Sequence, residues 1–224
     1  MLSAVIFDFD GIIVDTEPLH YRAFQQVLEP LGLGYSWDDY VAIYMGFDDR
    51  DAFREAFRVA GRSLDAGMLE RLIAAKAAAF QALSGAVDPY PGVVELIRTL
   101  SDSLPVALCS GALRCDILPI LQGLGLDRAF TVLVTADEVA ASKPDPASYS
   151  LAVERLAATY PERGISPATC LAIEDTPAGI ASAAGAGIPV LAVTNSYPAT
   201  VLTGAVKIVD SLAALSLETL LPLV

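Results

Sequence analysis

The stretch AVIFDFDG, residues 4–11, decides the fold. Its first four residues are apolar and partly β-branched, which predicts a short buried strand. The acidic residues with Gly11 mark the loop into which that strand runs. Five later apolar runs have the same character, and each is expected to form a further strand: 106–109, 132–134, 170–173, 190–193 and 206–209.

Apolar residues at helical spacing occupy intervals between these strands. Helices are expected at 93–100, at 113–124 and from Pro146 to about Tyr160, with Asp145 as N-cap and Pro146 at the first helical position. Strands that alternate with helices of this length predict βαβ units. The expected fold class is therefore α/β, with a Rossmann-like, doubly wound parallel sheet covered on both faces.

The segment from about Thr16 to Ser84 interrupts this alternation. It contains three expected helices, 18–31, 51–60 and 65–83, and no convincing strand. An insertion directly after the first strand places a small helical domain over the carboxyl edge of the sheet, where open α/β sheets bind ligands. We therefore expect an α/β core of residues 1–15 and 85–224, and an inserted helical domain of residues 16–84.

The composition limits the possible partners. The chain has 224 residues, of which 54% are hydrophobic and 18% charged, and its formal net charge is −13. High hydrophobicity excludes intrinsic disorder. The acidic excess without a basic cluster argues against binding to nucleic acids or to anionic membranes. A phosphate site in such a chain must create its own positive field from a metal ion, a lysine or backbone N–H groups.

The apolar runs and the cysteines bear on the cellular location of the protein. No apolar run approaches the ~20 residues of a membrane-spanning helix, and the N-terminus lacks the pattern of a signal peptide. Cys109, Cys115 and Cys170 are odd in number and show no CxxC spacing. We expect a cytoplasmic protein, monomeric or weakly dimeric, whose thiols are reduced and buried.

Asp8, Asp10 and Gly11 form the first of four polar clusters at predicted strand ends. Gly11 lets the chain turn, so that both carboxylates can approach one centre. Paired carboxylates fit a hard cation such as Mg²⁺, and they can also divide nucleophilic and acid/base roles. A polar strand-to-loop turn would need the same residues, so this cluster alone leaves both interpretations open.

Two further clusters follow later strands. Ser110 and Gly111 stand before a helix, where a hydroxyl and free N–H groups can bind an anion, although Ser110 could also act only as an N-cap. Lys143 stands before Pro144 in a loop that prolines make rigid, which suits a charge that must occupy a fixed point. An ordinary surface lysine is the alternative.

The fourth cluster is Glu174-Asp175, delivered by an apolar strand. Thr176 and Pro177 then predict the cap and first position of a helix. Adjacent side chains on a strand point in opposite directions, so only one of the two acids should reach a shared centre unless the strand has ended. We favour Asp175 as the metal ligand, with Glu174 nearby or behind it.

Taken together, the order and setting of these four clusters resemble the haloacid dehalogenase superfamily of phosphotransferases. The segments 15–20 and 174–180 are most similar to its β-phosphoglucomutase and phosphoglycolate phosphatase-like branch. The resemblance covers nearly the whole chain, and it identifies the helical insertion as the α-helical cap domain of that family.

The resemblance implies a Mg²⁺-dependent phosphatase of a small phosphorylated metabolite, such as a sugar phosphate or phosphoglycolate. Asp8 would be the nucleophile that forms an aspartyl phosphate, and Asp10 the general acid and base. Ser110 and Lys143 would hold the phosphoryl group. The implied metal ligands are Asp8, Asp10 through its main-chain carbonyl, Asp175 and Glu174. The implied substrate-binding residues are Phe9, Gly11, Thr16, His20, Lys76, Gly111 and Ala112.

Three positions in the insertion keep alternative interpretations. His20 lies either near the hinge and the leaving group or on a partly exposed helix face. Lys76 faces the cleft or extends along the surface. The acidic run 48–51 is expected to be a solvated helix start.

A mutase and a non-enzymatic regulator are the rival functions. A phosphomutase needs cationic cap residues for a second phosphate, but Met45 stands where the mutase has a lysine, and Asp49 falls at its cap arginine, with Arg50 one position later. These differences favour a hydrolase. A receiver-like regulator would bind Mg²⁺ and be phosphorylated on Asp8, but it would need neither Asp10 nor a cap. Asp10 also argues against haloacid dehalogenation itself.

Overall fold

The computed structural model describes residues 1–85 and 87–224 of the chain. Six parallel strands form one sheet in the order β3-β2-β1-β4-β5-β6. The predicted strands are all confirmed, with β4 one residue longer than expected and β6 one residue shorter. Their bounds are β1 (Ala4–Phe7), β2 (Val106–Cys109), β3 (Val132–Val134), β4 (Cys170–Glu174), β5 (Val190–Val193) and β6 (Lys207–Val209).

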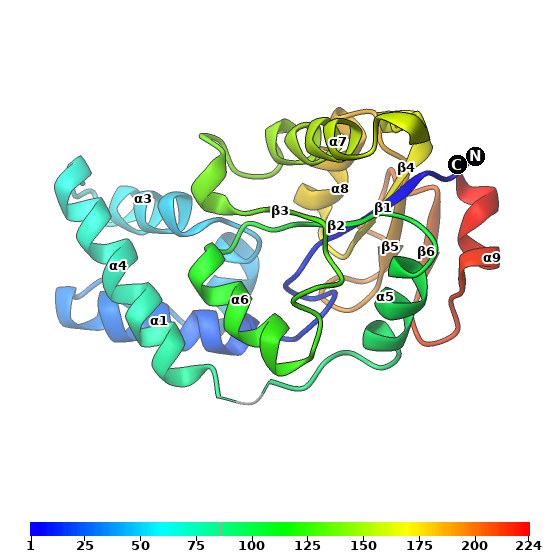
Figure 1. Cartoon of the computed structure of the whole chain (residues 1–224). Helices are drawn as coiled ribbons and strands as arrows, with labels where there is room; N and C mark the ends of the chain where they lie inside the picture. Colours follow the sequence, from blue (N-terminus) through cyan, green and yellow to red (C-terminus); the bar gives the residue numbers. More distant parts are fainter. Residues whose placement is uncertain (86) are drawn as a thin grey trace.

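Helices cover both faces of this sheet (Figure 1). Val5 and Phe7 of β1 pack in an apolar cluster with α5 and α6, whereas Ala4 and Ile6 pack in a second cluster with α7 and α8. Alternate residues of one strand thus enter opposite layers. The prediction of a doubly wound sheet is confirmed. The core helices are α5 (Val93–Ser101), α6 (Arg114–Gly123), α7 (Ala147–Thr159), α8 (Pro177–Gly185) and α9 (Leu217–Leu220).

The start of α7 differs by one residue from the prediction. Pro146 is the N-cap, and the helix begins at Ala147. The Asp145 carboxylate still accepts a hydrogen bond from the Ala147 N–H, at 2.9 Å, so it satisfies a free donor of the first turn from one position further out. Three short 3₁₀ turns connect other elements of the core: Ala136–Glu138, Pro161–Arg163 and Pro167–Thr169. A fourth, Leu221–Leu223, follows α9.

Helices fill most of residues 17–83, between β1 and α5 (Figure 1). They have an apolar core of their own. Phe24, Phe53, Phe57 and Leu72 are among the buried residues of this core. The helical cap is confirmed, while its exact limits, 16 and 84, stay predictions. Its elements are α1 (Glu17–Leu28), a 3₁₀ turn (Glu29–Leu31), α2 (Trp37–Asp39), a π-helical turn (Tyr40–Tyr44), α3 (Asp49–Val59) and α4 (Ala66–Leu83).

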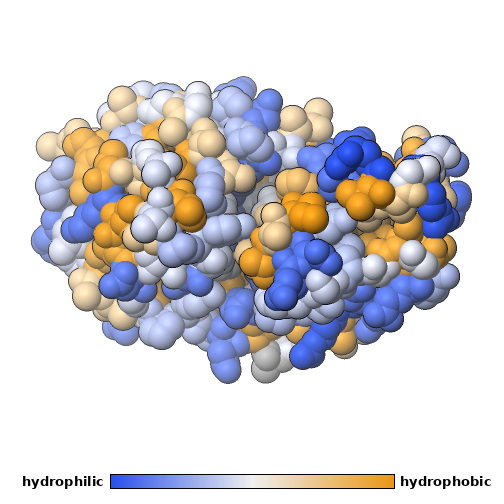
Figure 2. Space-filling view, turned by 180° about the vertical axis from the view of Figure 1, so that it is seen from behind, coloured by the Kyte–Doolittle hydropathy of each residue, from blue (hydrophilic) through white to orange (hydrophobic). Residues whose placement is uncertain are grey.

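The exposed surface is mixed in hydropathy (Figure 2), and two of the three cysteines are buried. On the face seen in Figure 2, apolar residues form several small patches separated by hydrophilic ones. Across the described part of the chain, no helix combines the length and the hydropathy needed to cross a bilayer. Cys109 and Cys170 are buried as expected, but Cys115 is exposed, so the prediction is wrong for that thiol. Cys115 lies in the first turn of α6 and faces outward, because Asp116 and Ile117 take the buried side.

Candidate active site

The order of the strands assembles the candidate site at the carboxyl edge of the sheet. Phe7 at the end of β1 is level with Leu108 on β2 and with Ile173 on β4. The polar residues that follow these positions therefore emerge side by side, although they are distant in the sequence. These residues are Asp8, Ser110, Glu174 and Asp175.

Lys143 enters this edge from the loop before α7 and is held there by two carboxylates. Its Nζ lies 2.8 Å from Asp8 Oδ1 and 2.6 Å from Glu174 Oε1, and it donates a hydrogen bond of 3.1 Å to the Cys109 carbonyl. Lys143 is 9% exposed, so the interpretation as a surface lysine is wrong. Burial alone would lower the pKa of Lys143, but the two carboxylates raise it well above its usual value.

Both acids of the fourth cluster reach the centre, because β4 ends at Glu174. Asp8, Glu174 and Asp175 each present one oxygen within 4.8 Å of the others. Glu174 is already engaged: Oε1 accepts from Lys143 and from the Tyr149 hydroxyl at 2.8 Å, and Oε2 accepts from the Asp175 N–H at 3.2 Å. Asp175 Oδ1 is buried and has no hydrogen-bond partner among the described residues. Of the two acids, Asp175 is therefore better prepared to bind a cation.

The chemistry of this cluster fits Mg²⁺. Its donors are hard carboxylate oxygens, the type that Mg²⁺ prefers. Burial and then repulsion from Glu174 raise the pKa of Asp8 to about 8, and burial with repulsion from Asp8 raises the pKa of Asp175 well above its usual range. A cation bound here would offset both the burial and the mutual repulsion of these carboxylates, which raise their pKa values.

Gly11 makes room for this arrangement. Its φ is 75°, and a Cβ at this position would lie 1.9 Å from Asp175 Oδ2, so a side chain would displace that carboxylate. Two residues that the sequence analysis missed support the same loop: Ser196 donates a hydrogen bond to Asp175 Oδ2, and Asn195 donates one of 2.7 Å to the Gly11 carbonyl. Neither stands in a motif, so no sequence signal identified them.

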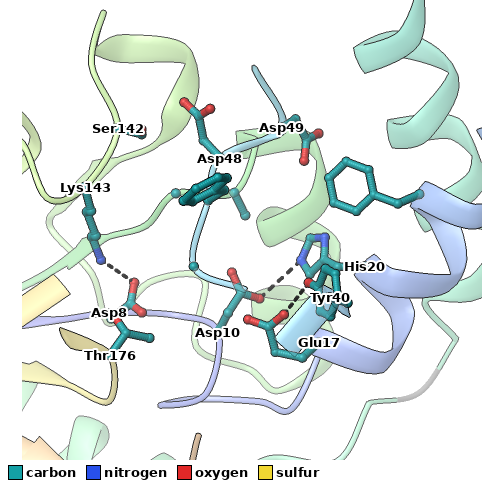
Figure 3. Close-up of a pocket in the computed structure, with 15 residues that line it drawn as sticks. Asp8, Asp10, Glu17, His20, Tyr40, Asp48, Asp49, Ser142, Lys143 and Thr176 are labelled. Atoms are coloured by element: carbon teal, nitrogen blue, oxygen red, sulfur yellow. Dashed lines mark hydrogen bonds and ion pairs between the residues drawn. The ribbon is translucent and has the colours of Figure 1, made fainter. Parts of the chain in front are cut away.

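The Asp10 carboxylate points toward His20 of the cap, not toward Asp8 (Figure 3). Its Oδ1 accepts a hydrogen bond from the Thr16 hydroxyl and lies 3.4 Å from His20 Nε2. Burial opposes the ionised form of Asp10, but the hydrogen bonds from His20 and Thr16 outweigh it and lower the pKa of Asp10. Thr16 and His20, which the sequence analysis singled out, thus both contact Asp10 from the start of α1.

Lys76 fixes the orientation of His20 from the cap. Its Nζ lies 2.7 Å from His20 Nδ1 and 2.8 Å from Asp49 Oδ1, with Asp116 Oδ2 at 3.8 Å. An ammonium group only donates, so Nδ1 accepts and the ring proton stands on Nε2, facing Asp10. Lys76 is fully buried, and the interpretation as a surface residue is wrong. The sequence analysis missed Asp116 and the partnership of Asp49.

The loop after β2 differs from the expected capping arrangement. Helix α6 starts at Arg114 with Leu113 as N-cap, so Ser110 does not cap it. Instead, the Ser110 hydroxyl accepts a 3.0 Å hydrogen bond from the Ala112 N–H and stabilises a tight loop beside Lys143. Phe9 is 1% exposed and packs in the apolar core, so only its backbone can contact a substrate.

A cavity that is partly open to solvent lies between the core residues and the cap (Figure 3). Its volume is about 50 Å³. The acids on its walls are Asp8, Asp10, Glu17, Asp48 and Asp49, and the other lining residues are His20, Phe24, Tyr40, Gly46, Phe47, Gly111, Ala112, Ser142, Lys143 and Thr176. Glu17 and Tyr40, which the sequence analysis missed, are joined by a hydrogen bond from the tyrosine hydroxyl.

The acidic run 48–51 starts helix α3 as expected, but Asp48 and Asp49 line this cavity and are buried, so the expectation of a solvated segment is wrong for these two residues. Asp48 is 2% exposed, caps α3 and pairs with Arg50, whose Nη1 donates a 2.8 Å hydrogen bond to the Val139 carbonyl of the core. The Ser142 hydroxyl donates a hydrogen bond to Asp51. Asp48 and Asp49 are buried because the segment contacts the core across the site, whereas the Asp51 side chain is 39% exposed.

A doubly wound parallel sheet, carboxylates and a lysine at its carboxyl edge, and an inserted helical cap together define a Rossmann-like α/β protein with a capped, acidic site. The sequence profile of the haloacid dehalogenase-like hydrolases matches residues 5–193. The chain belongs to this family.

Curated relatives and a solved structure agree with this assignment. The chain is 31% identical over 204 residues to protein CbbY of Rhodobacter capsulatus, covering 88% of this chain and 87% of the relative. It is 33% identical over 191 residues to the phosphorylated carbohydrates phosphatase of Thermotoga maritima, covering 84% and 82%. The structure of CbbY from Rhodobacter sphaeroides in complex with phosphate superposes with a TM-score of 0.85, at 25% identity, over 97% of this chain and 98% of the other.

Proposed function

We propose that this protein is a Mg²⁺-dependent phosphatase that hydrolyses a small phosphorylated sugar through an aspartyl phosphate on Asp8. The observation that carries the proposal is the placement of two aspartates with opposite surroundings. Asp8 lies against Lys143 and the other core carboxylates, while Asp10 lies across from it, bound by residues of the cap. One carboxylate can thus attack while the other exchanges protons.

Asp8, Asp175 and the main-chain carbonyl of Asp10 would hold Mg²⁺. The bound ion supplies positive charge that offsets the charge of the phosphoryl oxygens and of the carboxylates. Glu174 holds Lys143 and the loop of Asp175 in place through its hydrogen bonds.

In the first step, an oxygen of Asp8 attacks phosphorus and the bond from phosphorus to the substrate oxygen breaks. Lys143 and the N–H groups beside Gly111 stabilise the charge on the transferred group. The hydrogen bonds from His20 and Thr16 favour the ionised form of Asp10, so its carboxylate takes up a proton when the phosphate ester binds. Asp10 then gives this proton to the departing oxygen, and the product leaves as an alcohol. The hydrogen bonds from Thr16 and His20 keep the Asp10 carboxyl directed into the cavity.

In the second step, Asp10 takes a proton from water, which attacks phosphorus and releases inorganic phosphate and free Asp8. The proton that Asp10 gave up is thereby restored, and the cycle is balanced. The cavity of about 50 Å³ has room for a few water molecules, at ~10–15 Å³ each. A sugar phosphate needs more room than this arrangement leaves, so the cap must lie further from the core when the substrate is bound.

Hydrolysis of p-nitrophenyl phosphate with and without EDTA tests the proposal. We expect turnover that requires Mg²⁺, with inorganic phosphate as product. A phosphoprotein that accumulates without turnover would indicate a regulator instead. Formation of an isomeric sugar phosphate, rather than free sugar and phosphate, would indicate a mutase. The names of the relatives support a phosphorylated carbohydrate as the first class of substrate to screen.

A further inference from the structure

The cap side of the cavity is acidic. Facing Asp8 and Lys143, the cap contributes Glu17, Asp48 and Asp49 to the walls (Figure 3). Among the described lining residues, Lys143 is the one lysine or arginine, and it lies on the core side. A substrate whose phosphoryl group is bound at Asp8 and Lys143 therefore directs its other end toward carboxylates.

Asp49 is the acid on this wall that lacks a full set of partners. Its Oδ1 is paired with Lys76 at 2.8 Å, but its Oδ2 is buried with no hydrogen-bond partner among the described residues. The residue is 8% exposed and lines the same cavity as His20. A buried carboxylate oxygen without a donor is costly, and a donor from a ligand would remove that cost.

The neighbouring cations do not turn this wall into an anion site. Lys76 is fully buried behind Asp49 and is shared with His20 and with Asp116 at 3.8 Å. Arg50 is held by Asp48 and by the Val139 carbonyl. A second phosphate or a carboxylate at this end of the cavity would meet acidic oxygens before it met either cation, and like charges repel strongly in a buried site.

We propose that Asp49 forms a distal subsite that binds a hydrogen-bond donor of the substrate, a hydroxyl or an ammonium group, and rejects an anionic group there. This inference rests on the proposed phosphatase function and adds the substrate class: phosphomonoesters of neutral or amino sugars, as opposed to sugar bisphosphates and phosphorylated sugar acids. The hydrogen bond to Asp49 Oδ2 forms once the cap covers the bound substrate, so the correct substrate favours that position of the cap.

The test compares substrates that carry phosphate on the same carbon of a six-carbon skeleton. Glucose 6-phosphate offers distal hydroxyls, glucosamine 6-phosphate adds an ammonium group, and 6-phosphogluconate and glucose 1,6-bisphosphate add an anion. For the unmodified protein with Mg²⁺, we expect kcat/KM for at least one of the first two to exceed both anionic compounds by about 100-fold. The ratio between glucose and glucosamine phosphates shows which donor the subsite prefers.

Asp49→Asn tests whether Asp49 causes this substrate preference, because the substitution keeps the size of the side chain and removes its charge. We expect the preference over the anionic compounds to fall at least about 10-fold, since the repulsion is lost. Asp38→Asn is the matched control: it removes the same charge from an exposed position of the cap and should leave the preference unchanged. Thermal unfolding establishes that each variant is folded.

Equal kcat/KM for donor-bearing and anionic substrates in the unmodified protein would overturn the subsite while leaving the phosphatase proposal intact. A preference that survives in a folded Asp49→Asn variant would overturn the role of Asp49. Failure of the unmodified protein to hydrolyse any of these compounds, or p-nitrophenyl phosphate, would instead contradict the proposed function itself. If the variant does not fold, the substrate series on the unmodified protein still decides the inference.

Discussion

Replacing Lys143 by Met tests how strongly the carboxylates of the site depend on one buried cation. Lys143 Nζ makes contacts of 2.8 Å with Asp8 and 2.6 Å with Glu174, and its side chain is 8% exposed. Removing one member of a buried ion pair leaves an uncompensated charge, which costs about 3–5 kcal/mol. Met has a similar length and fills most of the same volume, so the loss is electrostatic rather than a packing defect.

Urea unfolding in EDTA at pH 7 measures this loss, and Lys207→Met is its control because Lys207 is exposed on the edge strand β6. We expect the control to change the free energy of unfolding by less than about 0.5 kcal/mol. The loss in Lys143→Met should shrink from pH 8 to pH 5. Burial and carboxylate repulsion already raise the pKa of Asp8 to about 8, so acid protonates the cluster and relieves the repulsion in the folded state.

The same variant should lose phosphatase activity. A positioned donor to a transferring phosphoryl group is worth on the order of 10²–10³-fold in kcat. A Lys143→Met protein that unfolds within 1 kcal/mol of the unmodified protein and turns over p-nitrophenyl phosphate at a similar rate would refute both the electrostatic role and the phosphoryl contact.

Three further predictions concern His20, the metal and the periphery. His20→Gln places an amide N–H near the position of Nε2, so kcat in steady-state assays should stay within about 10-fold of the unmodified protein. The shorter His20→Asn should lower kcat by about 10²-fold. Equal rates for the two variants would contradict a role for the His20–Asp10 contact. Mg²⁺ at about 100 times its Kd should stabilise the folded protein by about 2.7 kcal/mol, which calorimetry should record as a rise in Tm of roughly 5–10 °C. Asp175→Asn should abolish most of that rise. An unchanged rise in the variant would show that the ion binds elsewhere. Hydrogen bonds from Arg155 and Arg114 outweigh partial burial and lower the pKa of Glu138 to about 2, so its contribution is present above the usual pKa of 4.5 and is lost as pH falls toward 2. Glu138→Gln should therefore cost about 1 kcal/mol at pH 7, after allowance for solvent screening, and nothing near pH 2, in urea unfolding; a pH-independent loss would show that packing matters more.

The core of the fold could be predicted from the sequence because its signals are local. Each strand is a short run of apolar residues, and the buried parallel sheet requires this on both faces of every central strand. The candidate site followed from topology: parallel strands end at one edge, so Asp8, Ser110 and Asp175 had to be neighbours whatever their separation in the chain.

The cap residues could not be predicted as well, because their surroundings depend on tertiary contacts. Lys76 lies in an alanine-rich part of α4, where small residues leave no clear apolar stripe to show which face is buried. Asp48 and Asp49 look like a solvated helix start until the cap contacts the core. Tyr149 on α7 and Ser196 after β5 bind the carboxylates across the fold, and neither has a sequence neighbour that reveals it.

The central claim is that the Asp8 carboxylate attacks phosphorus. Asp8→Asn preserves the size of the side chain and removes the nucleophilic oxygen charge, so it tests the claim directly. With Mg²⁺ and p-nitrophenyl phosphate, we expect a folded protein with no turnover above background. A folded Asp8→Asn variant that hydrolyses the ester at a rate close to that of the unmodified protein would contradict the account.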